Sequence, residues 1–143
     1  MNLQGMSGLD LMRAVVAGQV SPSPMAKTMP MTFVVADPGH IRIIARADAR
    51  HLNPMGGVHG GFAATVLDSV TGCAVHSVLE AGVSYGTIAL QVKMLRPVPQ
   101  DQDLIAEGSA VHVSRNLATA EGTLKTTDGR LLATATATCF LKR

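Results

Sequence analysis

The chain is 143 residues long, which fits a single domain with a sizeable hydrophobic core. Apolar residues make up 47%, charged residues 15% and aromatic residues 3%, and the net charge is +2. This composition excludes a disordered chain, and it argues against a nucleic-acid or membrane-surface binder, which needs a basic face or stacking aromatics. So little charge on a small protein also favours self-association, which hides apolar surface.

Residues 1–24 are predicted to form a short helix followed by a connector. Ser7 fits the N-cap of this helix, apolar residues recur behind it at helical spacing, and two Ser-Pro pairs at 21–24 break the chain. We find no pattern typical of a signal peptide or a membrane span, and we therefore expect a cytoplasmic protein. Cys73 and Cys139 lie in unrelated contexts and are predicted to be free thiols.

Residues 31–141 are predicted to form the core of one domain that spans residues 1–143. Alternating apolar and polar residues indicate strands, and Asp128-Gly129 is typical of a tight hairpin between the last two. The predicted order is strands 31–36 and 41–49, a helix over 61–80, and strands 85–95, 103–113, 116–127 and 131–141. One long helix among many strands predicts an α+β fold in which an antiparallel sheet packs on that helix.

The predicted long helix carries a single formal charge, Asp68, between residues 61 and 79. An ordinary surface helix has Lys, Glu and Arg on its outer face, whereas the face around Asp68 holds small or apolar residues. These residues are Gly61, Ala64, Thr65, Thr71, Gly72, Val75 and Leu79. We therefore expect a second chain or a ligand to cover this face, which makes Asp68 a candidate functional carboxylate. The alternative is a solvated Asp68 on a helix that lacks lysines.

Glycines precede this helix, and free N–H groups at a helix N-terminus stabilise negative charge on a ligand. If the Gly60 N–H polarises a carbonyl while Asp68 directs a water at its carbon, both groups must lie within hydrogen-bonding reach of that carbonyl. Eight residues of helix span about 12 Å, which the Asp68 side chain cannot bridge. Two antiparallel copies of the helix would bring Gly60 of one chain near Asp68 of the other. The spacing therefore predicts a dimer with two shared sites.

The residues around the start of the helix form a motif. It reads H-x-N-x-x-G-x-x-H-G-G over residues 51–61, followed by an acidic residue, Asp68, seven positions after the last glycine. This pattern resembles the hotdog-fold acyl-CoA thioesterases of the phenylacetate-degradation (PaaI-like) type, in the 4-hydroxybenzoyl-CoA thioesterase superfamily, over residues 31–141. The resemblance implies a sheet wrapped around one long helix, and a homodimer or dimer of dimers with active sites between subunits. It also implies hydrolysis of an aryl- or short- to medium-chain acyl-CoA without a metal or other cofactor.

The resemblance also implies roles for individual residues. Asp68 would be the general base or nucleophile, and the Gly60 N–H would polarise the thioester carbonyl. Asn53 would hold the carbonyl or the water, and Thr87 would orient the water. His59 is placed in the site as a base or as the histidine that hydrogen-bonds the glycine-rich loop.

The coenzyme A moiety is expected to contact Arg96, Ser114 and Arg115. Many relatives carry Gly followed by Arg or Lys where this chain has Ser114 and Arg115. The departure weakens the expectation of phosphate contacts there, although a guanidinium pairs well with phosphate.

Two other functions fit the same architecture. A non-catalytic acyl-CoA-binding module would not need Asp68, and a hotdog enoyl-CoA hydratase or dehydratase uses different motifs at the helix start. The five histidines are scattered and do not have the spacing of a zinc site, so no metal is predicted. A serine hydrolase is disfavoured because no G-x-S-x-G motif is present.

Overall fold

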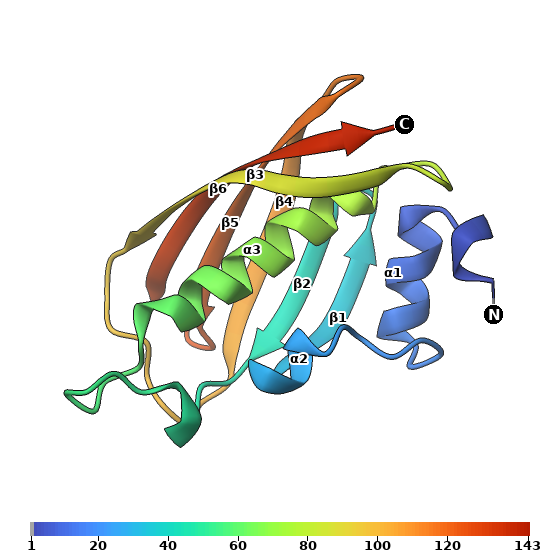
Figure 1. Cartoon of the computed structure of the whole chain (residues 1–143). Helices are drawn as coiled ribbons and strands as arrows, with labels where there is room; N and C mark the ends of the chain where they lie inside the picture. Colours follow the sequence, from blue (N-terminus) through green and yellow to red (C-terminus); the bar gives the residue numbers. More distant parts are fainter. Residues whose placement is uncertain (1) are drawn as a thin grey trace.

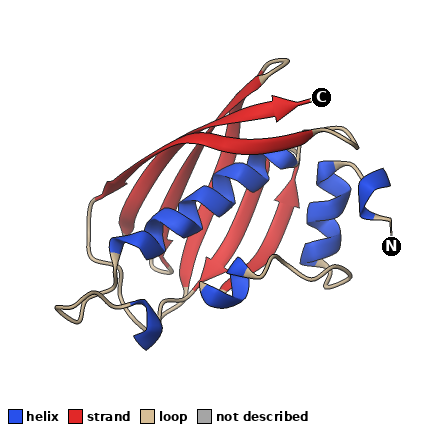
Figure 2. Cartoon of the chain, viewed as in Figure 1, coloured by secondary structure: helices blue, strands red, loops and turns tan. Residues whose placement is uncertain are grey.

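A computed structural model describes residues 2–143 and contains one long helix and six strands (Figures 1 and 2). The helices are α1 (Gly8–Val16), α2 (Met25–Thr28) and α3 (Gly60–His76), with 3-10 turns at Leu3–Gly5 and Ala49–His51. The strands are β1 (Met31–Asp37), β2 (His40–Ala45), β3 (Ser84–Met94), β4 (Leu104–Val113), β5 (Leu117–Thr126) and β6 (Leu131–Lys142). None of the helices within residues 2–143 is long and apolar enough to cross a membrane.

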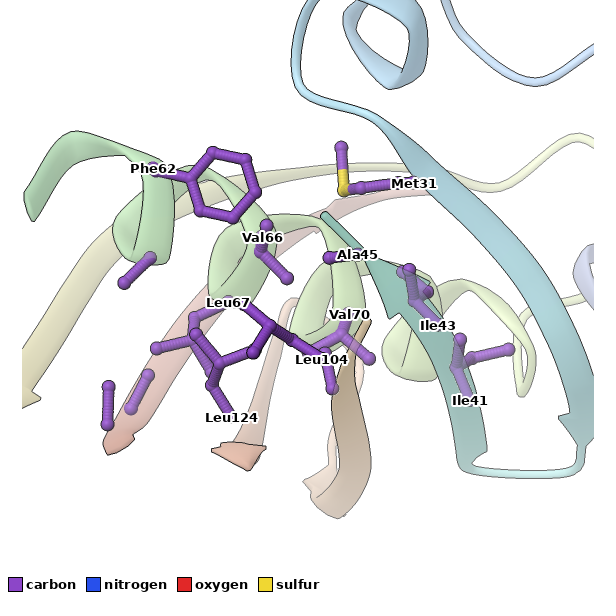
Figure 3. Close-up of a cluster of buried hydrophobic side chains, with 14 of the residues drawn as sticks. Met31, Ile41, Ile43, Ala45, Phe62, Val66, Leu67, Val70, Leu104 and Leu124 are labelled. Carbon is purple, nitrogen blue, oxygen red and sulfur yellow. The ribbon is translucent and has the colours of Figure 1, made fainter. Parts of the chain in front are cut away.

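The six strands form one antiparallel sheet in the order β1-β2-β4-β5-β6-β3. Figure 1 shows this sheet curving around α3, with β1 and β3 as its two edges. Phe62, Val66 and Val70 of α3 are fully buried, and they point into a core with Ile43 of β2 and Leu104 of β4 (Figure 3). The predicted α+β fold, with an antiparallel sheet wrapped around one long helix and a short N-terminal helix, is confirmed.

The backbone of α3 lies directly against the middle of the sheet. A Cβ atom built on Gly108 of β4 would lie 2.2 Å from the carbonyl oxygen of Val70, and one on Gly122 of β5 would lie 2.9 Å from a methyl carbon of Thr71. Only glycine leaves room for so close an approach. The two glycines therefore set the distance at which the sheet passes the helix.

Part of the predicted covered face of the helix is buried by the chain's own sheet. Thr71, Gly72, Val75 and Leu79, which we expected another chain or a ligand to cover, are buried within a single chain. The helical periodicity correctly indicated a buried helix, but it does not show how far a curved sheet reaches around it. A narrower open side remains around Asp68, which is exposed.

The second predicted strand ends earlier than residue 49. β2 stops at Ala45, although the alternation of buried residues continues to Ala47. The Asp48 side chain accepts the Arg50 N–H at 3.0 Å, and the ring Nδ1 of His51 accepts the Asp48 N–H at 3.0 Å. This reciprocal capping starts a 3-10 turn and takes the chain out of the sheet.

The N-terminal helix docks on the far end of α3. Ser7 caps α1 as predicted, because its side chain accepts the Asp10 N–H at 3.2 Å. The Gly8 N–H donates to the Leu79 carbonyl at 3.0 Å, and a Cβ on Gly8 would lie 1.7 Å from the His76 carbonyl oxygen. A backbone-to-backbone contact therefore fixes α1 beside the C-terminal end of α3 (Figure 1).

The contact between Gly108 and the helix backbone predicts a large loss of stability when a methyl group is added. We expect Gly108→Ala to lower the free energy of unfolding by about 3 kcal/mol, because the new Cβ forces α3 and β4 apart. The measurement is urea unfolding followed by circular dichroism. Gly86→Ala is the matched control, because a Cβ at that strand glycine meets no atom within 4 Å. Equal stabilities of the two variants would contradict the close packing.

Candidate functional site

The loop before α3 is ordered by Asn53. Its side-chain carbonyl oxygen accepts the Met55 N–H at 2.9 Å and the Gly57 N–H at 3.2 Å. Gly56 between them has a φ of +87°, a backbone conformation that glycine adopts without strain. The Asn53 amide N–H groups have no hydrogen-bond acceptor among residues 2–143, so this donor remains available to a ligand.

The first turn of α3 leaves one backbone donor free. His59 is the N-cap residue: its ring Nδ1 accepts the Gly61 N–H at 2.8 Å, and its carbonyl oxygen accepts the Phe62 N–H at 3.0 Å. The Gly60 N–H has no acceptor among residues 2–143. The position of His59 matches the predicted histidine that hydrogen-bonds the glycine-rich loop.

Gly60 and Arg96 line a common cavity of about 340 Å³ at this end of α3. Met94 and Val98 contribute to the same cavity, and the Arg96 guanidinium donates to the Leu131 carbonyl at 2.9 Å. The structure thus brings together two of the predicted site residues, a backbone donor and a cation. Asp68 does not line this cavity.

Asp68 and Thr87 line a second cavity, of about 660 Å³. Ser69 and Cys73 of α3 and Tyr85 of β3 lie on the same side of it. The predicted carboxylate and the predicted hydroxyl therefore meet at one site. As the helix spacing predicts, this site is separate from the one that holds Gly60.

The larger cavity is also lined by residues for which the sequence predicted no functional role. They belong to the N-terminal segment and to β1, and they are Leu3, Leu11, Met12, Val15, Val20, Ser21, Pro22, Ser23 and Phe33. Their helical spacing in α1 predicted only a buried face. No sequence signal distinguishes an apolar residue that lines a cavity from one that packs in the core.

Burial shifts the pKa of two groups that line the larger cavity. Burial raises the pKa of the Cys73 thiol to about 11, although a hydrogen bond with Tyr85 acts in the opposite direction. Burial also raises the pKa of the Tyr85 hydroxyl well above its ordinary value, as does the nearby Cys73. Among the cavity residues that the structure describes, Asp68 is the only charged one. Within residues 2–143, no three His, Cys, Asp or Glu side chains cluster as metal ligands would.

Ser114 and Arg115 lie away from both cavities, in the turn between β4 and β5. The Ser114 hydroxyl donates to the Leu117 carbonyl at 2.9 Å, which closes the turn. Arg115 is exposed, and its backbone carbonyl accepts a bond from the Arg143 guanidinium at 2.8 Å. Within one chain, the structure does not bring these two predicted coenzyme A contacts to Gly60 or Asp68.

Comparison with known proteins assigns this fold and motif to a family. The model of the thioesterase superfamily matches residues 55–133, which include Gly60, Asp68 and Thr87. The chain belongs to the thioesterase superfamily. The resemblance on which the sequence analysis relied is thereby confirmed.

Solved structures and a sequence relative agree with this assignment. A phenylacetic acid degradation-related protein from Ralstonia eutropha JMP134 is 34% identical, with a TM-score of 0.80 over 90% of this chain and 98% of that one. A hypothetical thioesterase from Streptococcus pneumoniae TIGR4, solved with coenzyme A, is 25% identical, with a TM-score of 0.72 over 78% of this chain and 85% of that one.

A protein of Halobacterium salinarum whose name places it among the esterases is 46% identical over 68 residues. That match covers 46% of this chain and 44% of the relative, so the chain spans less than half the length of that protein. The family match and these relatives support the predicted hydrolase.

The partly buried Tyr85 and Cys73 predict a loss of stability at alkaline pH. Both groups have a raised pKa in the fold, so the unfolded chain releases their protons first and the free energy of unfolding falls as the pH rises above about 9. Tyr85 is the only tyrosine, and the chain has no tryptophan, so tyrosinate absorbance reports this residue alone. We expect that absorbance to appear together with the loss of the circular dichroism signal. Titration of Tyr85 near pH 10 in an intact fold would contradict its burial.

Proposed function

We propose that the protein hydrolyses an acyl-CoA thioester to a free acid and coenzyme A. The observation that carries the proposal is the combination of a carboxylate, Asp68, beside an apolar cavity and an unpaired helix N–H at Gly60. Membership of the thioesterase superfamily supports the reaction, and the Streptococcus pneumoniae neighbour solved with coenzyme A supports the thiol portion of the substrate.

In the proposed reaction, a water oxygen bonds to the thioester carbonyl carbon while Asp68 takes a proton from that water. The Thr87 hydroxyl, on the same cavity, orients the water. Collapse of the tetrahedral intermediate breaks the C–S bond, and the departing thiolate takes up the proton. Direct attack by the Asp68 carboxylate, followed by hydrolysis of the resulting anhydride, uses the same groups.

The negative oxygen of the intermediate needs donors that are aligned before the reaction. We assign this role to the Gly60 N–H, assisted by the free amide of Asn53, with His59 holding the first turn of α3 in place. Arg96 lines the cavity beside Gly60 and is the best placed of the predicted coenzyme A contacts. Contact of Ser114 and Arg115 with the phosphates stays a prediction.

The proposed site needs two chains. Along α3, Asp68 and Gly60 are about 12 Å apart, and they line different cavities. An antiparallel second copy of α3 against the open side around Asp68 places the partner's donor opposite this chain's carboxylate. The edge strand β3, where Ile88 is 63% exposed, is free to pair with the same strand of the second copy.

Removal of the Asp68 charge tests the reaction. We expect Asp68→Asn to lower kcat by about a hundredfold to ten-thousandfold, because the water loses its proton acceptor. The assay follows release of free coenzyme A thiol from acyl-CoA substrates. Asp10→Asn is the matched control, an exposed helical aspartate outside both cavities. Acyl-CoA binding without turnover in the wild type would favour the binding module, and addition of water to an enoyl-CoA would favour the hydratase.

Replacement of Gly60 by proline removes the proposed oxyanion donor. Gly60 is the first residue of α3 and His59 before it is extended, so proline fits the backbone; it removes the N–H and adds a ring beside Met94. We expect Gly60→Pro to lower kcat by about a hundredfold to a thousandfold. Gly60→Ala is the matched control: its Cβ meets the same flexible Met94 side chain but the N–H is kept.

Co-expression of these variants tests whether the site is shared. In a mixed dimer of Asp68→Asn and Gly60→Pro chains, one site has both defects and the other has none. Random pairing therefore restores about a quarter of the wild-type activity, although each variant alone is inactive. The two-chain site would be contradicted if demonstrably mixed dimers recovered no activity. It would also be contradicted if sedimentation showed a well-folded monomer at micromolar concentration.

A further inference from the structure

The cavity beside Asp68 has a wall that lies outside the family match. The family model matches residues 55–133, whereas part of the cavity lining comes from residues before β1. We call this part the N-terminal wall, and it consists of six apolar residues and two serines: Leu3, Leu11, Met12, Val15, Val20, Ser21, Pro22 and Ser23. A segment that precedes the family match thus lines the cavity that holds the proposed base.

The N-terminal wall is fixed in place. The Gly8 contacts with the end of α3 leave no space for a side chain, and the Arg13 guanidinium donates to the Ala36 carbonyl at 3.2 Å. α1 is therefore attached both to α3 and to β1, between which it lies at one end of the fold (Figure 1). A wall held in this way sets a definite limit on what the cavity accepts.

Within one chain, the cavity has no cation to pair with a second negative charge. Asp68 is the only charged residue that lines it within the described chain. Arg13, the nearest basic residue along α1, does not line it and lies 3.7 Å from the Asp37 carboxylate. Burial of an unpaired carboxylate in such a place is costly, and the charge of Asp68 adds repulsion.

We infer that this cavity binds the acyl group of the thioester and that the N-terminal wall selects uncharged, apolar acyl groups. This inference rests on the proposed function. The volume of about 660 Å³ falls in the usual range for small-molecule sites. Each acyl methylene that is buried against the apolar residues of the wall raises kcat/KM by about fourfold, until the cavity is full. An acyl chain of the same length that ends in a carboxylate is rejected.

A substitution that narrows the cavity tests whether the N-terminal wall limits the length of the acyl group. Val15 lines the cavity, and the next residue, Val16, does not. We expect Val15→Phe to lower kcat/KM for octanoyl-CoA by about tenfold relative to acetyl-CoA, because only the longer chain reaches α1. The control Val16→Phe adds the same group to the same helix and leaves the octanoyl-to-acetyl ratio at the wild-type value. Circular dichroism and thermal unfolding check that both variants fold.

A pair of substrates of equal length tests the charge selection. Octanoyl-CoA and its analogue with a carboxylate on the last carbon differ in that one group. We expect kcat/KM to be about a hundredfold lower for the carboxylated substrate at neutral pH. Similar rates for the two would overturn the selection of uncharged acyl groups.

A binding measurement separates this inference from the proposed function. Tyr85 is the only tyrosine in a chain without tryptophan, and it lines the cavity, so intrinsic fluorescence reports ligand entry. Octyl-CoA, a thioether that cannot be hydrolysed, is the probe. We expect a saturable change in emission whose Kd is about tenfold weaker in Val15→Phe and unchanged in Val16→Phe.

The outcomes of the three experiments are distinguishable. If Tyr85 responds to octyl-CoA as described but no thioester is hydrolysed, the proposed function fails and the acyl site stands. If thioesters are hydrolysed while Val15→Phe changes neither the chain-length ratio nor octyl-CoA binding, the acyl site is wrong and the proposed function stands.

Discussion

The structure depends on the close approach of α3 to the centre of the sheet. The Val70 carbonyl lies where a Cβ of Gly108 would be, so no side chain separates the helix backbone from β4. At this distance the sheet curves around the helix instead of packing flat on one face. It buries Thr71 against Gly122 of β5, and Val75 against residues of β5 and β6. The remaining open side is narrow, and Asp68 is its charged residue.

That geometry keeps the proposed base, Asp68, apart from the proposed oxyanion donor, the Gly60 N–H of the same chain. A buried helix is a rigid rod with a rise of about 1.5 Å per residue, so Asp68 and the Gly60 N–H keep a fixed distance that no side-chain rotation bridges. The Gly60 N–H stays free, whereas His59 accepts the hydrogen bonds of the next two N–H groups, those of Gly61 and Phe62. Small residues beside Asp68 then have a physical purpose under the proposed function, since they allow a second helix to approach closely enough to complete the site.

The sequence predicted the elements and their order because hydrophobic periodicity follows directly from burial on one or two faces. It also indicated that Asp68 and Thr87 belong together, through the family pattern. It did not predict that β2 ends at Ala45, where reciprocal capping by Asp48 competes with sheet pairing. Nor did it predict the larger cavity, because Val15 has the same apolar character whether it lines a space or fills one. Such features arise from tertiary packing, which helical or strand periodicity does not encode.

The residues proposed to carry out the reaction differ from those proposed to select the acyl group. Under the proposed function, Asp68 and the helix donor act on the thioester carbonyl, which is common to all substrates, and their positions are set by one helix paired with its copy. The N-terminal wall contacts only the part of the acyl group that differs between substrates, and it is attached through Gly8, through Arg13 and through Met12, which packs in the hydrophobic core. Substitutions in α1 can therefore alter the accepted acyl group while the distance between carboxylate and donor, which the buried α3 determines, stays the same.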